Sequence, residues 1–591
     1  MESEQRTQLT RGARGAAQKN DNSALFAVIS GIATLGVLAY AIFLLNPANR
    51  GDFLPYALVI TAETILVFHA LLAMWTIMSS SYEPRDFRYH EAKRDLLPFV
   101  RRGDDGMYLK RHPVVIDVFV TVYGEDLDIV RRTVVAAIAL RGAHRTWVLD
   151  DGKSDAVRAL AGEVGARYVR RMSNTGAKAG NLNHALTLAK GDFFAVFDAD
   201  FVPKPEFLIE TVPFFVDESV AFVQTPQAYG NLHTAIARGA AYMQTMFYRF
   251  AQRGRNRFNA AFCVGTNVIF RRTAIDEIDG IYADSKSEDV WTALRLHEKG
   301  WRSIYIPDVL AIGDAPETIE AYSKQQLRWA TGGFEILLTH NPFSPRRRLN
   351  ADQRIQYFVT ATFYLTGIAP LLLLLVPPLE IFLDLRPMTM DITPWTWAFY
   401  YAGFYVMQIF LAWFVVGSFR WETLTLSTVS FPIYAKALWN VVCGKDVGWH
   451  VTGTASRRSP FNFIVPQVIF FVFLALTSVV GIWRDIGHGT VSLATAWNVT
   501  NTIILGAFLG TAVSEYRGMR RASVRRRREA PAAVPSFTPR TVVARPLAPV
   551  QIAAMTSEPM REPVQMLRSG PDTSSPGPRR HRSTLTPPIG A

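Results

Sequence analysis

Six long apolar segments constrain the fold of this chain more than any other feature of its sequence. Residues 24–46 and 54–78 precede a long mixed stretch, and four further segments follow it, at 355–383, 395–418, 461–483 and 493–513. Each segment has the roughly 20 residues that a membrane-spanning helix needs. The first is too long for the apolar core of a signal peptide, so we interpret it as a span. The sequence therefore predicts a multi-pass membrane protein of about six spans.

The composition indicates that a second, more polar part accompanies the spans. Of 591 residues, 49% are hydrophobic and 19% are charged, which is too polar for a protein made only of membrane helices. Apolar runs alternate with helix-like stretches in the middle of the chain, as in a mostly parallel α/β sheet. We expect a disordered tail at 1–22, two spans in 23–79, an α/β domain at 80–345, four spans with an amphipathic interfacial helix in 346–515, and a disordered basic tail at 516–591.

The positions of Lys and Arg predict the orientation in the membrane. The net charge is +13, and the basic residues gather in the two tails, at 85–112 and at 445–458, whereas the three remaining connections hold one Arg each. Basic connections stay on the cytosolic side. We therefore expect an inner-membrane protein with the α/β domain and both termini in the cytosol, and no nucleic-acid partner. The two cysteines allow neither a disulfide framework nor a cysteine-based metal cluster.

Acidic residues follow three successive predicted strands of the α/β domain. In chain order these residues, with their polar neighbours, are Tyr123 and Glu125, then Asp150 and Asp151, then Asp198 and Asp200. Asp and Gly also favour turns, so one such cluster alone would mean little. Ligands of open α/β sheets bind at the carboxyl ends of the strands. Three clusters in that position predict a binding site there.

The last cluster, Asp198-Ala199-Asp200, has the spacing of a metal-binding pair. Mg²⁺ typically uses one or two carboxylates together with phosphate oxygens, and such a cation would neutralise charge on a departing diphosphate. The pair therefore predicts Mg²⁺ or Mn²⁺ as the cofactor. Lys178 could add a second positive contact to the phosphates, and its alternative interpretation is a solvated lysine on a helix.

Two later segments offer groups that suit proton transfer, phosphate binding and the stacking of a ring. Asp289 begins a helical stretch, where an acid can cap the helix or act as a general base toward a hydroxyl. Arg328 offers a fork of donors suited to phosphate, and Trp329 offers a flat face for a sugar ring. The same pentapeptide would also suit a helix that lies on the membrane surface.

Seven motifs, DDG, KAGN, DAD, TPQ, FCVGTN, SED and QQLRW, carry a resemblance in their order and spacing. Together they are similar to the processive branch of glycosyltransferase family 2, above all to bacterial cellulose synthase catalytic subunits and related β-glucan synthases, over about residues 25–515. The resemblance implies a GT-A-like domain inserted between membrane helices. It also implies inverting transfer of glucose from UDP-glucose to a growing β-glucan that is exported across the inner membrane. A periplasmic accessory subunit is a further partner known in such systems.

The resemblance assigns roles to residues of these motifs. It implies Asp289 as the catalytic base and Asp198 and Asp200 as metal ligands. The remaining implied residues are Tyr123, Glu125, Asp150, Asp151, Lys178, Asp198 and Arg328 for the nucleotide-sugar, Phe262, Cys263, Gln325 and Trp329 for the acceptor, and Trp449, Val451 and Thr452 in a gating loop.

Four departures separate this chain from the family pattern. Ser287 replaces a usual Thr, Gln227 replaces the His of the T-P-H motif, and the gating loop lacks its lysine. Arg517 and Arg521 resemble half of a cyclic-di-GMP motif, without the β-barrel sequence that normally follows. The product could thus be cellulose or another β-linked polysaccharide, and the sequence does not predict cyclic-di-GMP control.

Two other functions compete with polymer synthesis. A channel or transporter would need ionisable residues in its spans, but Glu63, His69 and Glu380 form no repeated pattern, and no Walker-type phosphate loop is visible. A non-processive membrane glycosyltransferase would share the acid pair but typically lack the Q-x-x-R-W motif, which is present here at Gln325 to Trp329. The motif therefore favours polymerisation.

Overall fold

The computed structural model describes residues 24–102, 106–389, 392–417, 420–445 and 458–529. The predicted gating-loop residues Trp449, Val451 and Thr452 lie outside these ranges. The N-terminal tail expected at 1–22 and most of the C-terminal tail also lie outside them.

Among the described residues, five helical segments are long and apolar enough to cross a membrane. They are Val28–Leu45, Phe53–Ser81, Ala351–Leu383, Val465–His488 and Leu493–Ala522. They correspond to α2 (Ala24–Leu45), α3 (Phe53–Met78), α14 (Ala351–Thr362) continuing through η6 (Phe363–Gly367) into α15 (Ala369–Leu383), α19 (Val465–His488) and α20 (Leu493–Glu529). These five match five of the spans expected from the sequence, and the chain is a membrane protein.

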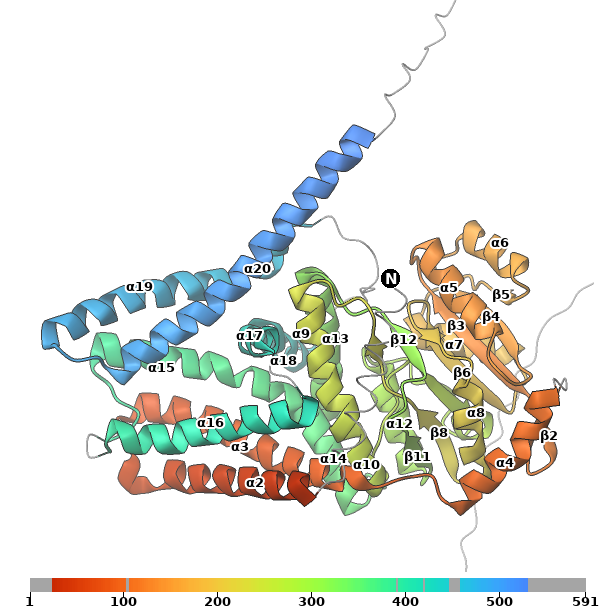
Figure 1. Cartoon of the computed structure of the whole chain (residues 1–591), viewed down its shortest axis with the longest axis horizontal. Coiled ribbons are helices and arrows are strands. Elements are labelled where there is room, and N and C mark those ends of the chain that lie inside the picture. The colour runs from red at the N-terminus through yellow and green to blue at the C-terminus, as the bar shows by residue number, and fades with distance from the viewer. Residues whose placement is uncertain (1–23, 103–105, 390–391, 418–419, 446–457, 530–591) are drawn as a thin grey trace, which may run out of the picture. The chain divides into compact units, whose positions relative to one another are not determined.

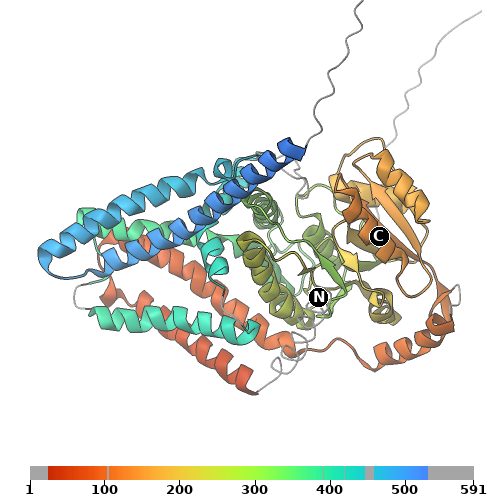
Figure 2. The ribbon, with the colours of Figure 1, turned by 45° about the horizontal axis from the view of Figure 1, so that its top comes forward.

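The sixth expected span, residues 395–418, forms the 23-residue helix α16 (Pro394–Val416), which is not one of these five. A count of six spans therefore remains a prediction. Helix α16 packs along α2, and α15 packs along α3 (Figures 1 and 2). Aromatic rings join α2 to α16: Tyr40 stacks on Phe404 with centroids 5.0 Å apart, and Phe43 stacks on Tyr400 at 4.5 Å.

A seven-stranded sheet forms the centre of the α/β domain, in the order β11-β8-β10-β6-β3-β4-β5. Every neighbouring pair is parallel except the two pairs made by β10. The strands are β3 (Ile116–Val122), β4 (Arg145–Asp150), β5 (Arg167–Val169), β6 (Phe193–Asp198), β8 (Val220–Gln224), β10 (Val268–Arg271) and β11 (Arg302–Tyr305). This confirms the mostly parallel α/β sheet that the sequence predicts.

The central strand β3 is buried along its whole length, as its run of β-branched and aromatic residues predicts. Successive side chains point to opposite faces of a strand: Val118 and Val120 join one hydrophobic core, while Phe119 joins the other. The register pairs Thr121 of β3 with Asp198 of β6. The ends of β3 and β6 therefore lie side by side, which brings two of the predicted site segments together.

Helices cover both faces of the sheet, and their starts are defined by local capping. Helix α5 (Leu127–Ile138) begins after Asp126, whose carboxylate accepts the amide of Asp128, and α6 (Asp155–Glu163) begins after Ser154. The helices that supply predicted site residues are α7 (Ala177–Leu188), α12 (Glu288–Glu298) and α13 (Ile319–Thr339).

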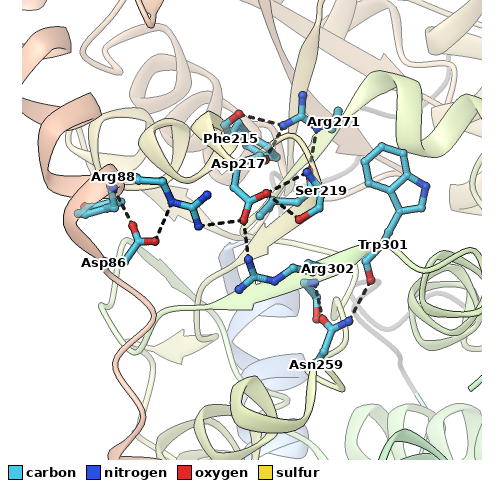
Figure 3. Close-up of polar contacts among 12 residues, drawn as sticks. Asp86, Arg88, Phe215, Asp217, Ser219, Asn259, Arg271, Trp301 and Arg302 are labelled. Atoms are coloured by element: carbon cyan, nitrogen blue, oxygen red, sulfur yellow. Dashed lines mark hydrogen bonds and ion pairs between the residues drawn. The ribbon is translucent and has the colours of Figure 1, made fainter. Parts of the chain in front are cut away.

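A cluster of charged side chains around Asp217 connects α4, the helix that follows the second span, to the edge of the sheet (Figure 3). Arg88, on α4 (Phe87–Arg102) after the second span, lies 3.5 Å from the Asp217 carboxylate, which also pairs with Arg302 of β11. Arg271 donates to the backbone carbonyl oxygens of Phe215 and Asp217, each at 3.0 Å. The cluster holds the start of β8, the start of β11 and α4 in fixed relation.

The amphipathic stretch 424–444, expected to be one interfacial helix, is instead two helices, α17 (Trp421–Val429) and α18 (Phe431–Val442). The break falls at Ser430, because Pro432 in the first turn of α18 has no amide hydrogen to continue the α17 ladder. Helix α18 packs against α13, and the Tyr434 hydroxyl donates to the Gln326 side-chain oxygen at 2.9 Å.

The C-terminal boundary also differs from expectation. The sequence predicts a disordered tail from residue 516, but α20 continues as one helix to Glu529. Residues 516–529 are rich in Arg, which is a good helix former, and they contain no proline. The first proline after the helix is Pro531. High local helix propensity extends the last span by about four turns beyond the predicted end.

Candidate active site

Asp198, the first acid of the predicted metal pair, is fixed in place at the end of β6. The Thr121 hydroxyl donates to its Oδ1 atom at 2.9 Å, and the Asp198 amide donates to the Thr266 hydroxyl at 2.9 Å. These contacts come from β3 and from the segment before β10. Asp200 follows two residues later, in the turn after the strand.

Lys178 reaches this acid from the first turn of α7. Its ammonium group pairs with Asp198 and donates to the carbonyl oxygen of Gly265 at 2.8 Å. Gly265 has φ of +81°, and a Cβ there would lie 3.4 Å from Lys178 Nζ and 3.5 Å from Asp289 Oδ2. The left-handed backbone favours glycine at this position, whereas the contacts of an added Cβ would be ordinary. Gly265 therefore lies at the meeting point of the predicted phosphate-binding lysine and the predicted base.

The acids around Asp200 disfavour a negative charge on its side chain and would attract a cation. Burial, and then the charges of Asp198, Glu125 and Asp314, raises the pKa of Asp200 to about 8. Burial also raises the pKa of Glu125. Among the described residues, no group of three or more Asp, Glu, His or Cys side chains is arranged to hold a metal alone. Two carboxylates that would complete their shell with diphosphate oxygens fit this arrangement, because Mg²⁺ is commonly held in that way.

The predicted base, Asp289, lies in the first turn of α12 and borders a small pocket. Side chains from α7, β6, β10 and α12 surround this pocket together with the segment before β10. The residues that line it are Lys178, Leu182, Val196, Cys263, Gly265, Phe270, Ile281, Glu288, Asp289 and Thr292. Three residues predicted separately from the sequence, Lys178, Cys263 and Asp289, thus line the same pocket.

Burial and nearby charges shift the pKa values of Asp289 and of its neighbour Glu288. Burial raises the pKa of Asp289, while the Val290 amide, Arg328 and Lys178 act in the opposite direction. Burial and the neighbouring Asp289 charge raise the pKa of Glu288 to about 7. A carboxylate with a raised pKa and a hydrogen-bonded orientation can take a proton from a hydroxyl group. The Val290 amide donates to Asp289 Oδ1 at 2.8 Å, which leaves Oδ2 facing Gly265.

Two of the predicted acceptor residues, Phe262 and Cys263, lie in the segment before β10, and the other two lie on α13. The Cys263 thiol donates to the backbone carbonyl of Asp289 at 3.1 Å, and Phe262 is buried beside Phe247. Gln325 and Trp329 lie half-buried on α13. Arg328, on the same helix, interacts with Asp289. The structure therefore brings Cys263 and Arg328 to Asp289.

The two acids of the DDG segment face into the protein. Asp150 accepts hydrogen bonds from the Ser154 amide at 2.8 Å and the Tyr168 hydroxyl at 2.8 Å. Asp151 is held by the Arg171 guanidinium through bonds of 2.7 and 2.6 Å. Their predicted contact with a nucleotide stays a prediction. Earlier in the site, Tyr123 is exposed, and its amide donates to the Glu125 carboxylate at 2.7 Å.

Several residues that shape the site were not singled out from the sequence. Thr121 and Thr266 orient Asp198, Gly265 accepts Lys178, and Arg171 neutralises Asp151. The FCVGTN motif contained Gly265 and Thr266, so a signal for these two was present. Nothing near Arg171 in the sequence indicates its partner.

Comparisons with known proteins agree with this fold. Residues 112–332 match the family described as glycosyltransferase like family 2, and residues 275–432 match the family described as cellulose synthase. The two matches together span more than half of the chain. The α/β domain is therefore a glycosyltransferase domain. The chain belongs to the cellulose-synthase-like members of glycosyltransferase family 2, which confirms the resemblance seen in its motifs.

Individual relatives point the same way. Cellulose synthase 2 of Novacetimonas hansenii is 30% identical over 66% of this chain and 26% of its own length. The cellulose synthase catalytic subunit [UDP-forming] of Pseudomonas fluorescens is 31% identical over 70% of this chain and 59% of its own length. The chain thus spans less than two thirds of either relative. Among solved structures, the mannosyltransferase PcManGT from Pyrobaculum calidifontis, in complex with GDP-Man and Mn²⁺, has 16% identity and a TM-score of 0.43, covering 66% of this chain and 100% of its own.

Proposed function

We propose that this protein is a processive, inverting glycosyltransferase that moves glucose from UDP-glucose to a growing β-glucan and exports the polymer across the inner membrane. The observation that carries the proposal is the shared pocket of Lys178, Cys263 and Asp289, in which Lys178 also contacts Asp198. A phosphate-binding cation, an acceptor-side residue and a base meet there at the end of the sheet.

The reaction follows from these positions. The acceptor hydroxyl oxygen forms a bond to the anomeric carbon of the donor sugar, and the bond from that carbon to the diphosphate breaks. Asp289 takes the proton of the attacking hydroxyl. Lys178 and Arg328 bind the diphosphate oxygens as UDP departs. Asp198 and Asp200 would hold a Mg²⁺ or Mn²⁺ ion, which when bound supplies positive charge for the leaving group.

The remaining assignments complete the proposal. Tyr123, Glu125, Asp150 and Asp151 are proposed for the nucleotide side of the donor. Phe262, Gln325 and Trp329 are proposed, with Cys263, for the glucan end. The proposed orientation places the catalytic domain and both termini in the cytosol, where nucleotide-sugars are made, with a periplasmic accessory subunit as a further partner.

The test is the product made by the purified, reconstituted full chain from separate radiolabelled UDP-sugars, digested with linkage-specific glucanases. Polymer made from UDP-glucose and cut by a β-1,4-glucanase is expected. Polymer of another sugar or linkage would favour a different β-linked polysaccharide, and single-sugar addition to lipid or protein would favour a non-processive transferase. Absence of any transfer would contradict the proposal.

A matched pair of variants assigns the base. Asp289→Asn should retain UDP binding and lose elongation, because the amide cannot accept the hydroxyl proton. Asp276→Asn, on the exposed surface of the same domain and paired with Arg272, should polymerise at the wild-type rate. Substantial elongation by Asp289→Asn would show that another group is the base.

A further inference from the structure

The helix that carries the Q-x-x-R-W motif, α13, makes an exceptionally close contact with the turn before α12. A Cβ atom at Gly332 would lie 2.1 Å from the Ser287 Oγ atom, 2.4 Å from its Cβ atom and 3.1 Å from its amide nitrogen. Ordinary contacts between such atoms begin near 3.4 Å. The two segments can therefore approach this closely only because residue 332 has no side chain.

Glycine is otherwise a poor choice at this position. In the interior of a helix it costs about 0.5–1 kcal/mol relative to alanine, because the unfolded chain gains freedom. Gly332 lies in the middle of a 21-residue helix. The close packing against Ser287 gives that cost a physical reason.

A second contact fastens the same turn to the same face of α13. The Ser285 hydroxyl donates to the Glu335 carboxylate at 2.6 Å, and the Ser287 amide donates to the Ser285 hydroxyl at 3.2 Å. Residues 332 and 335 are three apart, so they lie on one helix face. The turn is thus held at two points along α13 while Ser287 itself makes no capping bond to α12.

This docked turn leads directly to the proposed base. Asp289 follows Ser287 by two residues in the first turn of α12, and Arg328 precedes Gly332 by four residues, one turn along the same face of α13. Arg328 is one of the cations that lower the pKa of Asp289. The spacing between the two helices therefore sets how far the base lies from the cation of the Q-x-x-R-W motif.

We infer that Gly332 and Ser287 are positioning residues: the packing of the Ser287 side chain on the Gly332 backbone fixes the base-bearing turn against α13, so that Asp289 and Arg328 act on one substrate. The inference rests on the proposed function. Neither residue is assigned a contact with substrate. A larger residue at 332 would push α13 and the turn apart while leaving the nucleotide-binding groups of β3, β6 and α7 in place.

Two glycines of α13 give a matched pair of variants. Gly332→Ala should lower kcat by about 10²-fold, the scale expected when reacting groups are displaced by about 1 Å. UDP affinity should decrease much less, because Arg328 is the only proposed UDP-binding residue on α13. Gly333→Ala adds the same atom to the next residue, where it would meet the Tyr364 ring at 3.3 Å and the Thr360 carbonyl oxygen at an ordinary 3.5 Å. This control should stay within about threefold of the wild-type kcat. A general structural defect would lower UDP affinity and kcat by similar factors.

Compensating changes at Ser287 identify the contact itself. Ser287→Gly removes the two atoms nearest the added methyl group, so that the amide nitrogen at 3.1 Å becomes its nearest neighbour. Ser287→Gly/Gly332→Ala should therefore recover most of the lost kcat. Ser287→Ala/Gly332→Ala keeps the Cβ at 2.4 Å and should remain impaired. The melting temperatures of the same proteins should show the same pattern of coupling, independently of catalysis.

The outcomes separate the two proposals. A Gly332→Ala variant with wild-type kcat, or equal recovery by the Ala and Gly changes at position 287, would overturn the positioning role alone. Wild-type protein that transfers no sugar at all would overturn the proposed function and this inference together.

Discussion

Lys178 and Asp198, 20 residues apart in the chain, form an ion pair at the end of the central strands. Lys178 thus contacts the first acid of the predicted metal pair. Its ammonium group also donates to the carbonyl oxygen of Gly265, which lies beside the proposed base. A metal ion and a diphosphate entering together would supply a new partner for each member of the pair. The ion pair therefore keeps both charges neutralised until the donor binds.

Replacing Lys178 should affect both binding and pH dependence. Lys178→Met is expected to weaken UDP binding by about tenfold, the equivalent of one charged contact. Because Lys178 lowers the pKa of Asp289, its loss should raise that pKa, and the acidic limb of the pH–kcat profile should move to higher pH. Lys190→Met, two residues after the far end of α7, should change neither quantity. An acidic limb that stays in place would contradict the proximity of Lys178 to the base.

Metal binding should compete with a proton at Asp200. The pKa of Asp200 is raised to about 8, so the proton must leave before a cation can bind well. Affinity for Mn²⁺ in the presence of UDP should rise with pH up to about 8 and then level off, as measured by calorimetry. In Asp200→Asn the slope should disappear. Affinity that is independent of pH in the wild type would place the cation elsewhere.

The same raised pKa predicts a stability trend for the metal-free protein. The unfolded chain releases the Asp200 proton near its ordinary pKa, whereas the folded chain retains it up to about pH 8. Between these values the folded state binds more protons, so the free energy of unfolding should decrease as pH rises. Thermal unfolding in chelator should show a steeper decrease for the wild type than for Asp200→Asn.

Asp151 should contribute to the stability of the fold in addition to its predicted contact with the nucleotide. Asp151→Asn removes the charge that balances the buried Arg171 guanidinium, and breaking one partner of a buried pair costs about 3–5 kcal/mol. We expect a clear decrease in the free energy of unfolding in chemical denaturation. Asp155→Asn, which pairs with Arg170 on the exposed surface, should cost less than about 1 kcal/mol. Equal costs for the two variants would mean that the Arg171 pair contributes no more than an exposed one.

The ionic cluster at the sheet edge gives a comparison of two adjacent acids. Asp217→Asn weakens the pairs with Arg302 and Arg88 and should lower the free energy of unfolding by about 1–2 kcal/mol. Glu218→Gln changes a side chain that is 88% exposed and should cost almost nothing. Thermal melting of the two variants in the same detergent measures the difference. An equal effect would show that the cluster is not a structural tie.

Much of the fold was predictable because it depends on local patterns. The apolar spans and the runs that became β3, β4, β6 and β8 are strong signals of length and composition. Antiparallel β10, inserted between β6 and β8, was not predicted, because its order in the sheet depends on distant partners. The tail boundary was wrong because charge was weighed above the high helix propensity of residues 516–529.

The candidate site shows the same division. Residues in ordered motifs, such as Asp198, Lys178 and Asp289, could be named from the sequence, and the structure brings Lys178 into contact with Asp198 and into one pocket with Asp289. The ion pair of Asp151 with Arg171 and the contact of Ser287 with Gly332 could not be predicted from the sequence. Their partners are remote in sequence, and only the packing of elements reveals them.

Helix α13 carries two of the predicted acceptor residues, Gln325 and Trp329, and at Gln326 it accepts a hydrogen bond from Tyr434 of α18. The sequence predicts that the stretch containing α18 lies at the membrane interface. A bilayer of different thickness that displaces α18 should then also displace α13, and Arg328 with it. We therefore expect turnover of the reconstituted protein to change with the acyl length of the surrounding lipids.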